Sequence, residues 1–215
     1  MNDCQLYLIT PESLDPAAFA PRLAEALDAG PVAAVQLRLK NVPDDTIRRA
    51  VDVLQPVAHA RNVAFILNDR PDLAVSCGCD GAHVGMDDGD VTAARRILGA
   101  DLQLGVSCYD SRDMALRAGE AGADYVAFGA FFPSPSKETE VRADPALLTW
   151  WSSMIELPVV AIGGITPDNC GTLVRAGADF LSVISAVWSH PDGPGAGVRA
   201  MNTAIAAAED AQGSI

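Results

Sequence analysis

Short apolar runs alternate with longer amphipathic segments along this chain. The run at residues 159–162 is short and rich in β-branched residues, which suits a strand buried on both faces of a parallel sheet. Comparable runs recur along the sequence. We expect strands at residues 5–10, 32–37, 63–67, 81–84, 102–106, 125–128, 159–162 and 180–184.

The segments between these runs have the spacing of helices with one buried face. Phe19, Leu23 and Leu27, for example, follow one another every four residues. A long loop is expected at residues 129–143. We expect helices at residues 16–29, 44–61, 73–77, 91–98, 114–121, 147–155, 167–176 and 196–208.

About eight strands alternating with about eight helices over 215 residues are typical of the α/β class and of a (β/α)8 TIM barrel. No linker or low-complexity segment interrupts the pattern, so we expect a single domain over residues 1–215. A Gly-Ala-Asp triplet recurs at 99–101, 122–124 and 177–179, each time between a helix and the next strand. This placement predicts a connector on the N-terminal face of the barrel. A doubly wound sheet is the alternative, but no GxGxxG turn follows the first strand.

The composition and the first residues indicate a cellular compartment. The chain is 49% hydrophobic, yet no apolar run approaches the roughly 20 residues that span a bilayer. The first residues lack the basic region of a signal peptide. We therefore expect a cytoplasmic protein without a membrane partner. Five cysteines, an odd number, indicate reduced thiols.

The formal net charge is -13, which disfavours nucleic acid as a partner because a binding surface for it would be basic. An anionic substrate would then need locally concentrated positive charge or a metal ion. The chain has only two lysines, Lys40 and Lys137, and each follows a predicted strand. Nothing in the sequence indicates an oligomeric state.

In a TIM barrel, the active site lies at the carboxyl ends of the strands. Gln36, Arg38 and Lys40 follow the second strand, alternating with Leu37 and Leu39. Residues two apart share one face of a strand, so these three polar side chains should face the barrel mouth together.

Acidic residues follow the third and fourth strands. Asp69 and Asp88 would come from adjacent strands and could share Mg²⁺, which takes one or two carboxylates and leaves its other positions to water and phosphate. Asp87 is the competing ligand, and helix capping is the alternative role for Asp88. His83 lies inside a predicted strand, where we expect a hydrogen-bonded core residue rather than a catalytic base.

The last strands point to a second anion site. Gly163 and Gly164 follow the seventh strand, Thr166 can cap the next helix, and Pro167 suits its first position. A strand, a glycine turn and a helix start form a phosphate site in many proteins, although an ordinary turn is the alternative. Further hydroxyls and a cation are expected near the mouth at Ser107, Ser134, Ser136, Lys137 and Ser185.

The two predicted anion sites differ. One has Arg38, Lys40, Lys137 and a metal ion, whereas the other has backbone amides and Ser185. An enzyme that joins a diphosphate ester to a monophosphate would need this layout. The cations would stabilise the charge that grows on a departing diphosphate.

Seven stretches, in this order, resemble the thiamine phosphate synthase family. They are residues 35–40, 68–70, 80–88, 105–107, 133–137, 161–165 and 183–186. The resemblance implies a transferase of thiamine biosynthesis that couples hydroxymethylpyrimidine diphosphate to thiazole phosphate and releases diphosphate. The chemistry it implies is departure of diphosphate to leave a stabilised pyrimidine cation, followed by attack of the thiazole nitrogen.

The resemblance also implies roles for residues. The pyrimidine diphosphate would be held by Gln36, Arg38, Lys40, Asn68, Ser107 and Lys137, with Arg38, Lys40 and Lys137 as catalytic groups. Asp69 and Asp88 would bind Mg²⁺. The thiazole phosphate would be held by Ser134, Ser136, Gly164, Ile184 and Ser185.

Some positions depart from the family pattern. Leu39 stands where Glu is usual, Met86 where Gln is common and Ala130 where Pro is common, while Ser134 and Ser136 replace threonines. Two alternatives on the same scaffold are a thiazole tautomerase-like isomerase, which usually carries a His where this chain has Ala130 and Phe131, and a non-catalytic paralogue that binds phosphorylated ligands. A sugar-phosphate isomerase or epimerase would need a base near the phosphate site, and the sequence offers none there.

Overall fold

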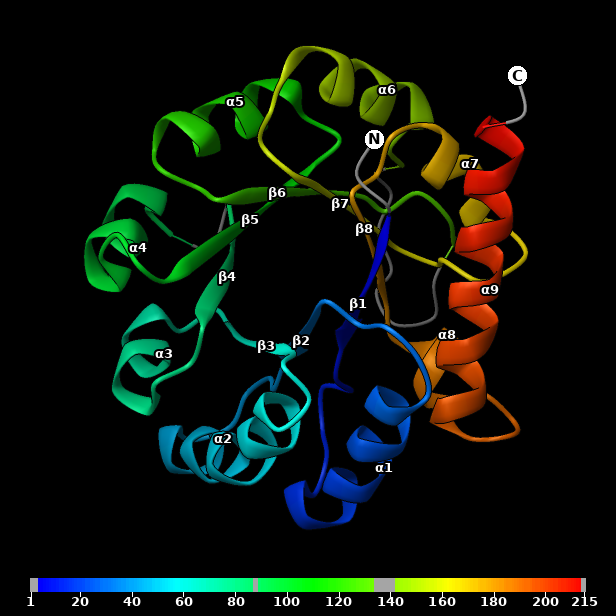
Figure 1. Ribbon diagram of the computed structural model, residues 1–215. Coiled ribbons are helices and arrows are strands. Elements are labelled where there is room, and N and C mark those ends of the chain that lie inside the picture. Colours follow the sequence, from blue (N-terminus) through cyan, green and yellow to red (C-terminus); the bar gives the residue numbers. More distant parts are fainter. Residues whose placement is uncertain (1–3, 87–88, 134–141, 214–215) are drawn as a thin grey trace.

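The computed structural model describes residues 4–86, 89–133 and 142–213. Its strands are all parallel and close into a barrel in chain order, β1 to β8 (Figure 1). The closure pairs β1 with β8, so the TIM barrel predicted from the alternating pattern is confirmed. The strands are β1 Gln5–Ile9, β2 Ala34–Leu37, β3 Ala64–Asn68, β4 Gly81–Gly85, β5 Gln103–Tyr109, β6 Tyr125–Phe128, β7 Val159–Ile162 and β8 Phe180–Val183.

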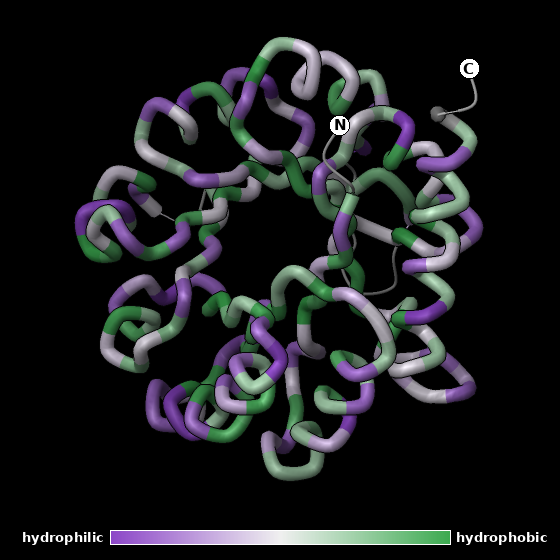
Figure 2. The backbone as a smooth tube through the Cα atoms, in the orientation of Figure 1, coloured by the Kyte–Doolittle hydropathy of each residue, from purple (hydrophilic) through white to green (hydrophobic). Residues whose placement is uncertain are grey.

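Helices surround the ring of strands on its outside (Figure 1). In Figure 2 most of them carry both hydrophilic and hydrophobic residues, as expected of helices with one face on the strands and one in solvent. The helices are α1 Pro16–Asp28, α2 Asp44–His59, α3 Pro71–Cys77, α4 Val91–Leu98, α5 Arg112–Glu120, α6 Pro145–Met154, α7 Cys170–Arg175, α8 Ser185–Trp188 and α9 Pro194–Gly213.

Alternation along the strands creates two apolar cores among the described residues. Leu6, Leu8 and Val35 belong to the larger core, which lies between the strands and the helices. The smaller core fills the barrel interior and contains Tyr7, Ile9, Ala34, Ile66, Tyr125, Ala127 and Val160. Since both faces of each strand are buried, the strands read as continuous apolar runs in the sequence.

Aspartates close the N-terminal face of the barrel. The carboxylates of Asp80, Asp124 and Asp179 each accept a hydrogen bond from the first residues of the preceding strand, at Phe65, Leu104 and Val159 respectively, over 2.6, 2.7 and 2.8 Å. Asp124 and Asp179 end two of the Gly-Ala-Asp triplets, so their predicted role as connectors is confirmed.

The predicted helix at 167–176 begins too early. Helix α7 starts at Cys170 with Asn169 as its N-cap residue, so Thr166 and Pro167 do not take the predicted cap and first positions. The Asn169 side chain instead accepts from the Thr166 amide at 2.9 Å and donates to the Gly164 carbonyl at 2.9 Å. This local bonding holds residues 166–169 in a turn.

Other boundaries differ where the sequence signal is weak. Helix α8 was not predicted, because four residues are too few to show a period. Strand β5 continues beyond the predicted Val106 to Tyr109, with a register shift against β6 between Ser107 and Tyr109. All five cysteines are free thiols, as predicted. Among the described helices, none is both long and apolar enough to cross a membrane.

Candidate active site

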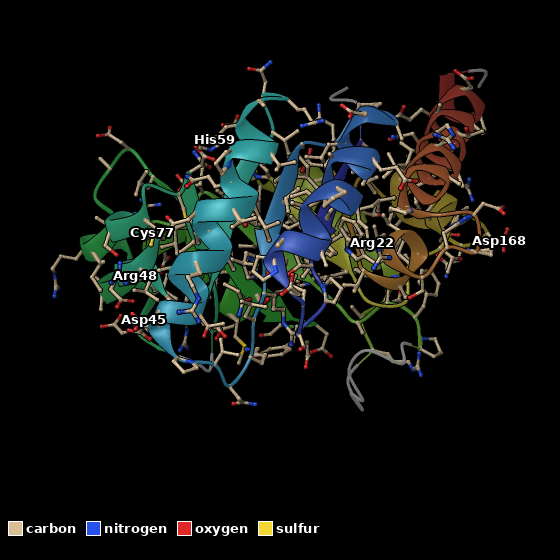
Figure 3. All side chains as sticks on the ribbon, turned by 90° about the horizontal axis from the view of Figure 1, so that it is seen from below. Arg22, Asp45, Arg48, His59, Cys77 and Asp168 are labelled. Carbon is tan, nitrogen blue, oxygen red and sulfur yellow. The ribbon has the colours of Figure 1, made fainter. Side chains whose placement is uncertain are left out.

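A cavity of about 170 Å³ opens at the carboxyl ends of the strands. In the side view of Figure 3 this end of the barrel points downward: Asp45, at the start of α2, lies on this side, and His59, at the end of α2, lies on the opposite side. Each strand, or the residues directly after it, contributes to the cavity lining. The polar side chains in the lining are Gln36, Arg38, Asn68, His83, Ser107 and Tyr109.

The alternation predicted after the second strand is present. Gln36 and Arg38 line the cavity, whereas Leu37 is fully buried in the outer core and Leu39 packs against that core. The backbone amide of Arg38 donates to the hydroxyl of Thr10 at 3.0 Å, which fixes the end of β2 to the end of β1.

Both cations that follow β2 are paired with acids at the rim. Arg38 Nη1 lies 2.5 Å from Glu12 Oε1, and Lys40 Nζ lies 2.5 Å from Asp69 Oδ2. The hydrogen bond from Arg38 holds the pKa of Glu12 below its usual range. Lys40, Asp69 and Arg38 therefore gather on one side of the barrel mouth.

The rim also contains non-glycine residues in the left-handed region. Asp69, Tyr109 and Asn41 have φ values of 63, 54 and 55°. Such conformations are uncommon outside glycine and concentrate at functional sites. Asp69 is held there partly by its backbone amide, which donates to the carbonyl of His83 at 2.8 Å.

His83 is buried and hydrogen-bonded, as predicted, and it also lines the cavity. Its Nδ1 lies 3.2 Å from the Tyr125 hydroxyl and its Nε2 lies 2.8 Å from Ser107 Oγ. Burial lowers the pKa of His83 to about 4, although the nearby Asp69 carboxylate opposes this shift. The imidazole is therefore neutral at pH 7, and both ring nitrogens are already engaged.

Asn68 carries an unsatisfied donor at the cavity. Its Nδ2 atom is buried and has no hydrogen-bond partner among the described residues. Buried polar atoms are nearly always paired, so such an atom in a cavity lining is a donor that a ligand can satisfy. This observation supports the predicted role of Asn68 in binding a substrate.

The glycine turn after β7 packs tightly against the segment that follows β6. Gly163 and Gly164 have φ values of 103 and 64°, and a Cβ at Gly164 would lie 2.3 Å from the carbonyl oxygen of Pro133. The amide of Phe132 donates to the Gly163 carbonyl at 3.0 Å. Gly163 and Ile184 line the cavity, whereas Gly164 packs against Pro133 and Ser185 begins α8.

One of the two carboxylates predicted to bind magnesium lies at the described rim. Within the described ranges, no group of three or more His, Cys, Asp or Glu side chains is placed to hold a metal. Mg²⁺ needs only one or two carboxylates when substrate phosphates supply other ligands, and Asp69 is a carboxylate at the cation-rich rim. Its predicted partner Asp88, and the competitor Asp87, lie outside the described residues.

The structure brings together most of the predicted site that it describes. Gln36, Arg38, Asn68, Ser107 and Ile184 line one cavity, and Lys40 and Asp69 form an ion pair at its rim. Ser134, Ser136 and Lys137 lie outside the described residues.

Some polar residues in the described part of this end of the barrel were not predicted to belong to the site. Tyr7 and Tyr125 look like ordinary core residues in the sequence, and Glu12 like a solvated loop residue. Tyr109 was missed because the predicted fifth strand ended too early; an extended strand would have placed it on the face of Ser107.

Comparison with known proteins gives a consistent result. A family model described as thiamine monophosphate synthase matches residues 6–187. A thiamine-phosphate synthase of Rhodospirillum centenum is 62% identical over 202 residues, which cover 94% of this chain and 98% of that protein. A thiamine-phosphate synthase of Erythrobacter litoralis is 49% identical over 208 residues, covering 95% and 96%.

A solved structure agrees in fold. Thiamine phosphate pyrophosphorylase from Pyrococcus furiosus has a TM-score of 0.83 and 30% identity, and the match covers 96% of this chain and 98% of that chain. The sequence matches extend over nearly the full length of this chain and of its relatives. This chain therefore belongs to the thiamine monophosphate synthase family.

Proposed function

We propose that this chain is a transferase of thiamine biosynthesis that joins hydroxymethylpyrimidine diphosphate to thiazole phosphate, forming thiamine phosphate and diphosphate. Relatives that match nearly the whole chain carry the name of this activity. The observation that carries the proposal is the gathering of Arg38, Lys40 and Asp69 at one side of a cavity in an acidic protein.

Arg38 and Lys40 would act on the leaving group. As the C–O bond of the pyrimidine substrate breaks, the electron pair stays on the diphosphate, whose negative charge grows. Fixed cations at that point stabilise the transition state more than the ground state. A bound diphosphate would compete with Glu12 for Arg38 and with Asp69 for Lys40. Lys137 would supply a third cation.

Asp69 and Asp88 would hold Mg²⁺, which would supply further positive charge to the diphosphate when bound. If a metal ion takes the Asp69 carboxylate, Lys40 is released from its ion pair and can turn to the substrate. The position of Asp69 beside Lys40 thus fits a carboxylate that exchanges one cation for another.

The thiazole phosphate would bind near the ends of β7 and β8, the common phosphate position in this fold. Ile184 lines the cavity there, and Gly164 and Ser185 lie directly beside the lining residues Gly163 and Ile184 in the chain. Ser134 and Ser136 would add hydroxyls. The thiazole nitrogen would then form the new C–N bond, for which no protein base is essential.

The isomerase alternative has less support. It would need a base at the cavity, and His83, the histidine in the described lining, has both ring nitrogens engaged and a pKa lowered to about 4 by burial. A group that is already bonded on both sides is poorly suited to take a proton from a substrate.

The test is direct. Purified protein is mixed with both substrates and Mg²⁺, and release of diphosphate and formation of thiamine phosphate are followed; reactions lacking one substrate serve as controls. We expect both products to form in equal amounts. Binding of both ligands without product would contradict the proposal and favour the non-catalytic paralogue.

A further inference from the structure

A chain of four hydrogen bonds crosses the barrel interior at the floor of the cavity. Gln36 Nε2 donates to the Tyr7 hydroxyl at 3.0 Å, and that hydroxyl lies 3.0 Å from the hydroxyl of Tyr125. Tyr125 lies 3.2 Å from His83 Nδ1, and His83 Nε2 lies 2.8 Å from Ser107 Oγ. We call these five residues the floor chain. They come from five strands, β2, β1, β6, β4 and β5.

The floor chain is closed to solvent in its middle and open to the cavity at its ends. Gln36, Tyr7, Tyr125 and His83 are only 2, 4, 8 and 8% exposed. Both end members, Gln36 and Ser107, line the cavity, as does His83. The interior of the barrel therefore connects two ligand-facing groups through buried polar atoms.

The hydrogen bonds of the floor chain can have only one donor-to-acceptor order. The amide nitrogen of Gln36 can only donate, so Tyr7 accepts from it and must pass its own proton to Tyr125. Tyr125 then donates to His83 Nδ1, which must be unprotonated. Any reversal would set two donors against each other or leave a buried hydroxyl unpaired, which is costly.

The direction of these hydrogen bonds determines which ring nitrogen of His83 carries the proton. A ring nitrogen that accepts a hydrogen bond carries no proton, so an accepting Nδ1 leaves the ring proton of His83 on Nε2, 2.8 Å from Ser107 Oγ. His83 then donates to Ser107 Oγ. Among the described residues no other side chain bonds that oxygen, so the hydroxyl proton of Ser107 is left to donate elsewhere.

The packing of the barrel interior accommodates the floor chain. A Cβ at Gly105 would lie 2.1 Å from Cζ of Tyr125, so the tyrosine ring needs a glycine beside it on β5. The rings of His83 and Tyr125 are also in contact, with centroids 5.6 Å apart. Both contacts restrict where the Tyr125 hydroxyl can lie.

We propose that Tyr7, Tyr125 and His83 are positioning residues that hold His83 in its Nε2–H tautomer and thereby direct the hydroxyl proton of Ser107 into the cavity. Because the side-chain nitrogen of Gln36 donates to Tyr7, its side-chain carbonyl oxygen is left to accept from a ligand. The floor thus offers a donor at one end and an acceptor at the other. An aromatic heterocycle with a ring nitrogen as acceptor and an amino group as donor matches this pair; this reading of the ligand rests on the proposed function.

The tautomer can be measured without substrate. In ¹⁵N-labelled protein, two-dimensional NMR of the imidazole nitrogens distinguishes a protonated Nε2 from a protonated Nδ1. We expect His83 to be the Nε2–H tautomer in the wild type and to become a mixture in Tyr125→Phe. An Nδ1–H tautomer in the wild type, or an unchanged tautomer in Tyr125→Phe, would overturn the proposal whatever the enzyme's activity.

Kinetics test the consequence for the substrate. Tyr125→Phe keeps the ring and removes the hydroxyl, and we expect KM for the pyrimidine diphosphate to rise about tenfold, as for one lost hydrogen bond, with KM for thiazole phosphate unchanged. His83→Gln, whose amide nitrogen can reach Ser107, should retain more affinity than the shorter His83→Asn.

Ser182→Ala is the matched control, because Ser182 is also buried inside the barrel and its hydroxyl has no partner among the described residues. We expect its KM values to equal those of the wild type. Equal losses in both His83 variants, or a loss shared by both substrates, would overturn the positioning role. Circular dichroism of each variant shows whether the barrel is intact.

Discussion

The charged groups at the two ends of the barrel have different kinds of partner. At the N-terminal end, the carboxylates of Asp80, Asp124 and Asp179 are bonded to backbone amides of the preceding strands. At the carboxyl end, Arg38 and Lys40 are paired with half-exposed or rim carboxylates, and Asn68 has a buried donor without a partner among the described residues.

This difference separates charged groups that stabilise the fold from charged groups that a ligand can engage. A carboxylate that binds backbone amides cannot leave without exposing them, so it stabilises the fold. Side-chain ion pairs at a rim are weak and can exchange one partner for another. The left-handed backbone at Asp69 and Tyr109 adds local cost at the same end. The carboxyl end therefore has the properties of a surface that a ligand completes.

The largest expected effect is at Asp69. Asn tolerates the left-handed backbone of this position, so Asp69→Asn keeps the geometry and removes the charge. We expect turnover to fall at least about 1,000-fold, or about 4 kcal/mol, with little change in unfolding free energy. Diphosphate release at increasing Mg²⁺ measures it. Near-normal turnover in this variant would remove Asp69 from the metal site.

The matched change at the opposite end is Asp124→Asn. Asp124 accepts from the Leu104 amide and pairs with Arg95, so we expect a loss of about 1–3 kcal/mol in unfolding free energy. Turnover per folded molecule should stay at the wild-type value. Urea denaturation and the diphosphate assay together measure the two quantities. A drop in turnover of the folded protein would show that the two ends are not separate in function.

Gly105→Ala tests the interior that joins the two ends. The added methyl group would collide with the Tyr125 ring, and overpacking of this kind costs about 1–3 kcal/mol. We expect Gly105→Ala to lower the unfolding free energy and also to raise KM for the pyrimidine diphosphate, as in Tyr125→Phe. Gly119→Ala is the control. Gly119 lies inside helix α5, and a methyl group there would meet Leu157 at an ordinary 3.5 Å. Because alanine favours a helix over glycine, this change should stabilise the protein by up to about 1 kcal/mol.

The smallest expected effect is at Glu12. Its side chain is 51% exposed, and an exposed ion pair is worth about 0–1 kcal/mol. Glu12→Gln should therefore lower KM for the pyrimidine diphosphate by no more than about fivefold, because Arg38 no longer has to exchange partners. Steady-state kinetics at low salt gives the measurement, and an increase in KM would mean that Glu12 helps to hold Arg38 in its working position.

Much of the fold could be predicted because burial on both faces gives uninterrupted apolar runs. The strands at 125–128 and 159–162 and the helix at 91–98 were predicted with the bounds that the structure has. The alternation of Gln36 and Arg38 with Leu37 and Leu39 likewise follows from the two-residue period of a strand. These are local properties, and a sequence displays them directly.

The remainder depends on groups that are distant in sequence. Tyr7 and Tyr125 meet only because β1 and β6 face each other across a closed ring, and nothing local distinguishes them from ordinary core tyrosines. The start of α7 was misjudged because Thr166 and Asn169 are both good cap residues, and the side chain that bonds the turn decides between them. The departure at Leu39 has a structural counterpart, since that side chain packs on the outer core.

The contact between Gly105 and the ring of Tyr125 has a consequence for how such barrels diverge. The two positions are coupled: a larger residue at 105 is accommodated best by a smaller one at 125, and the phenolic hydroxyl is lost in that exchange. Relatives that keep the tyrosine should keep the glycine, and a pair of compensating replacements would identify a lineage that recognises its ligand by other means.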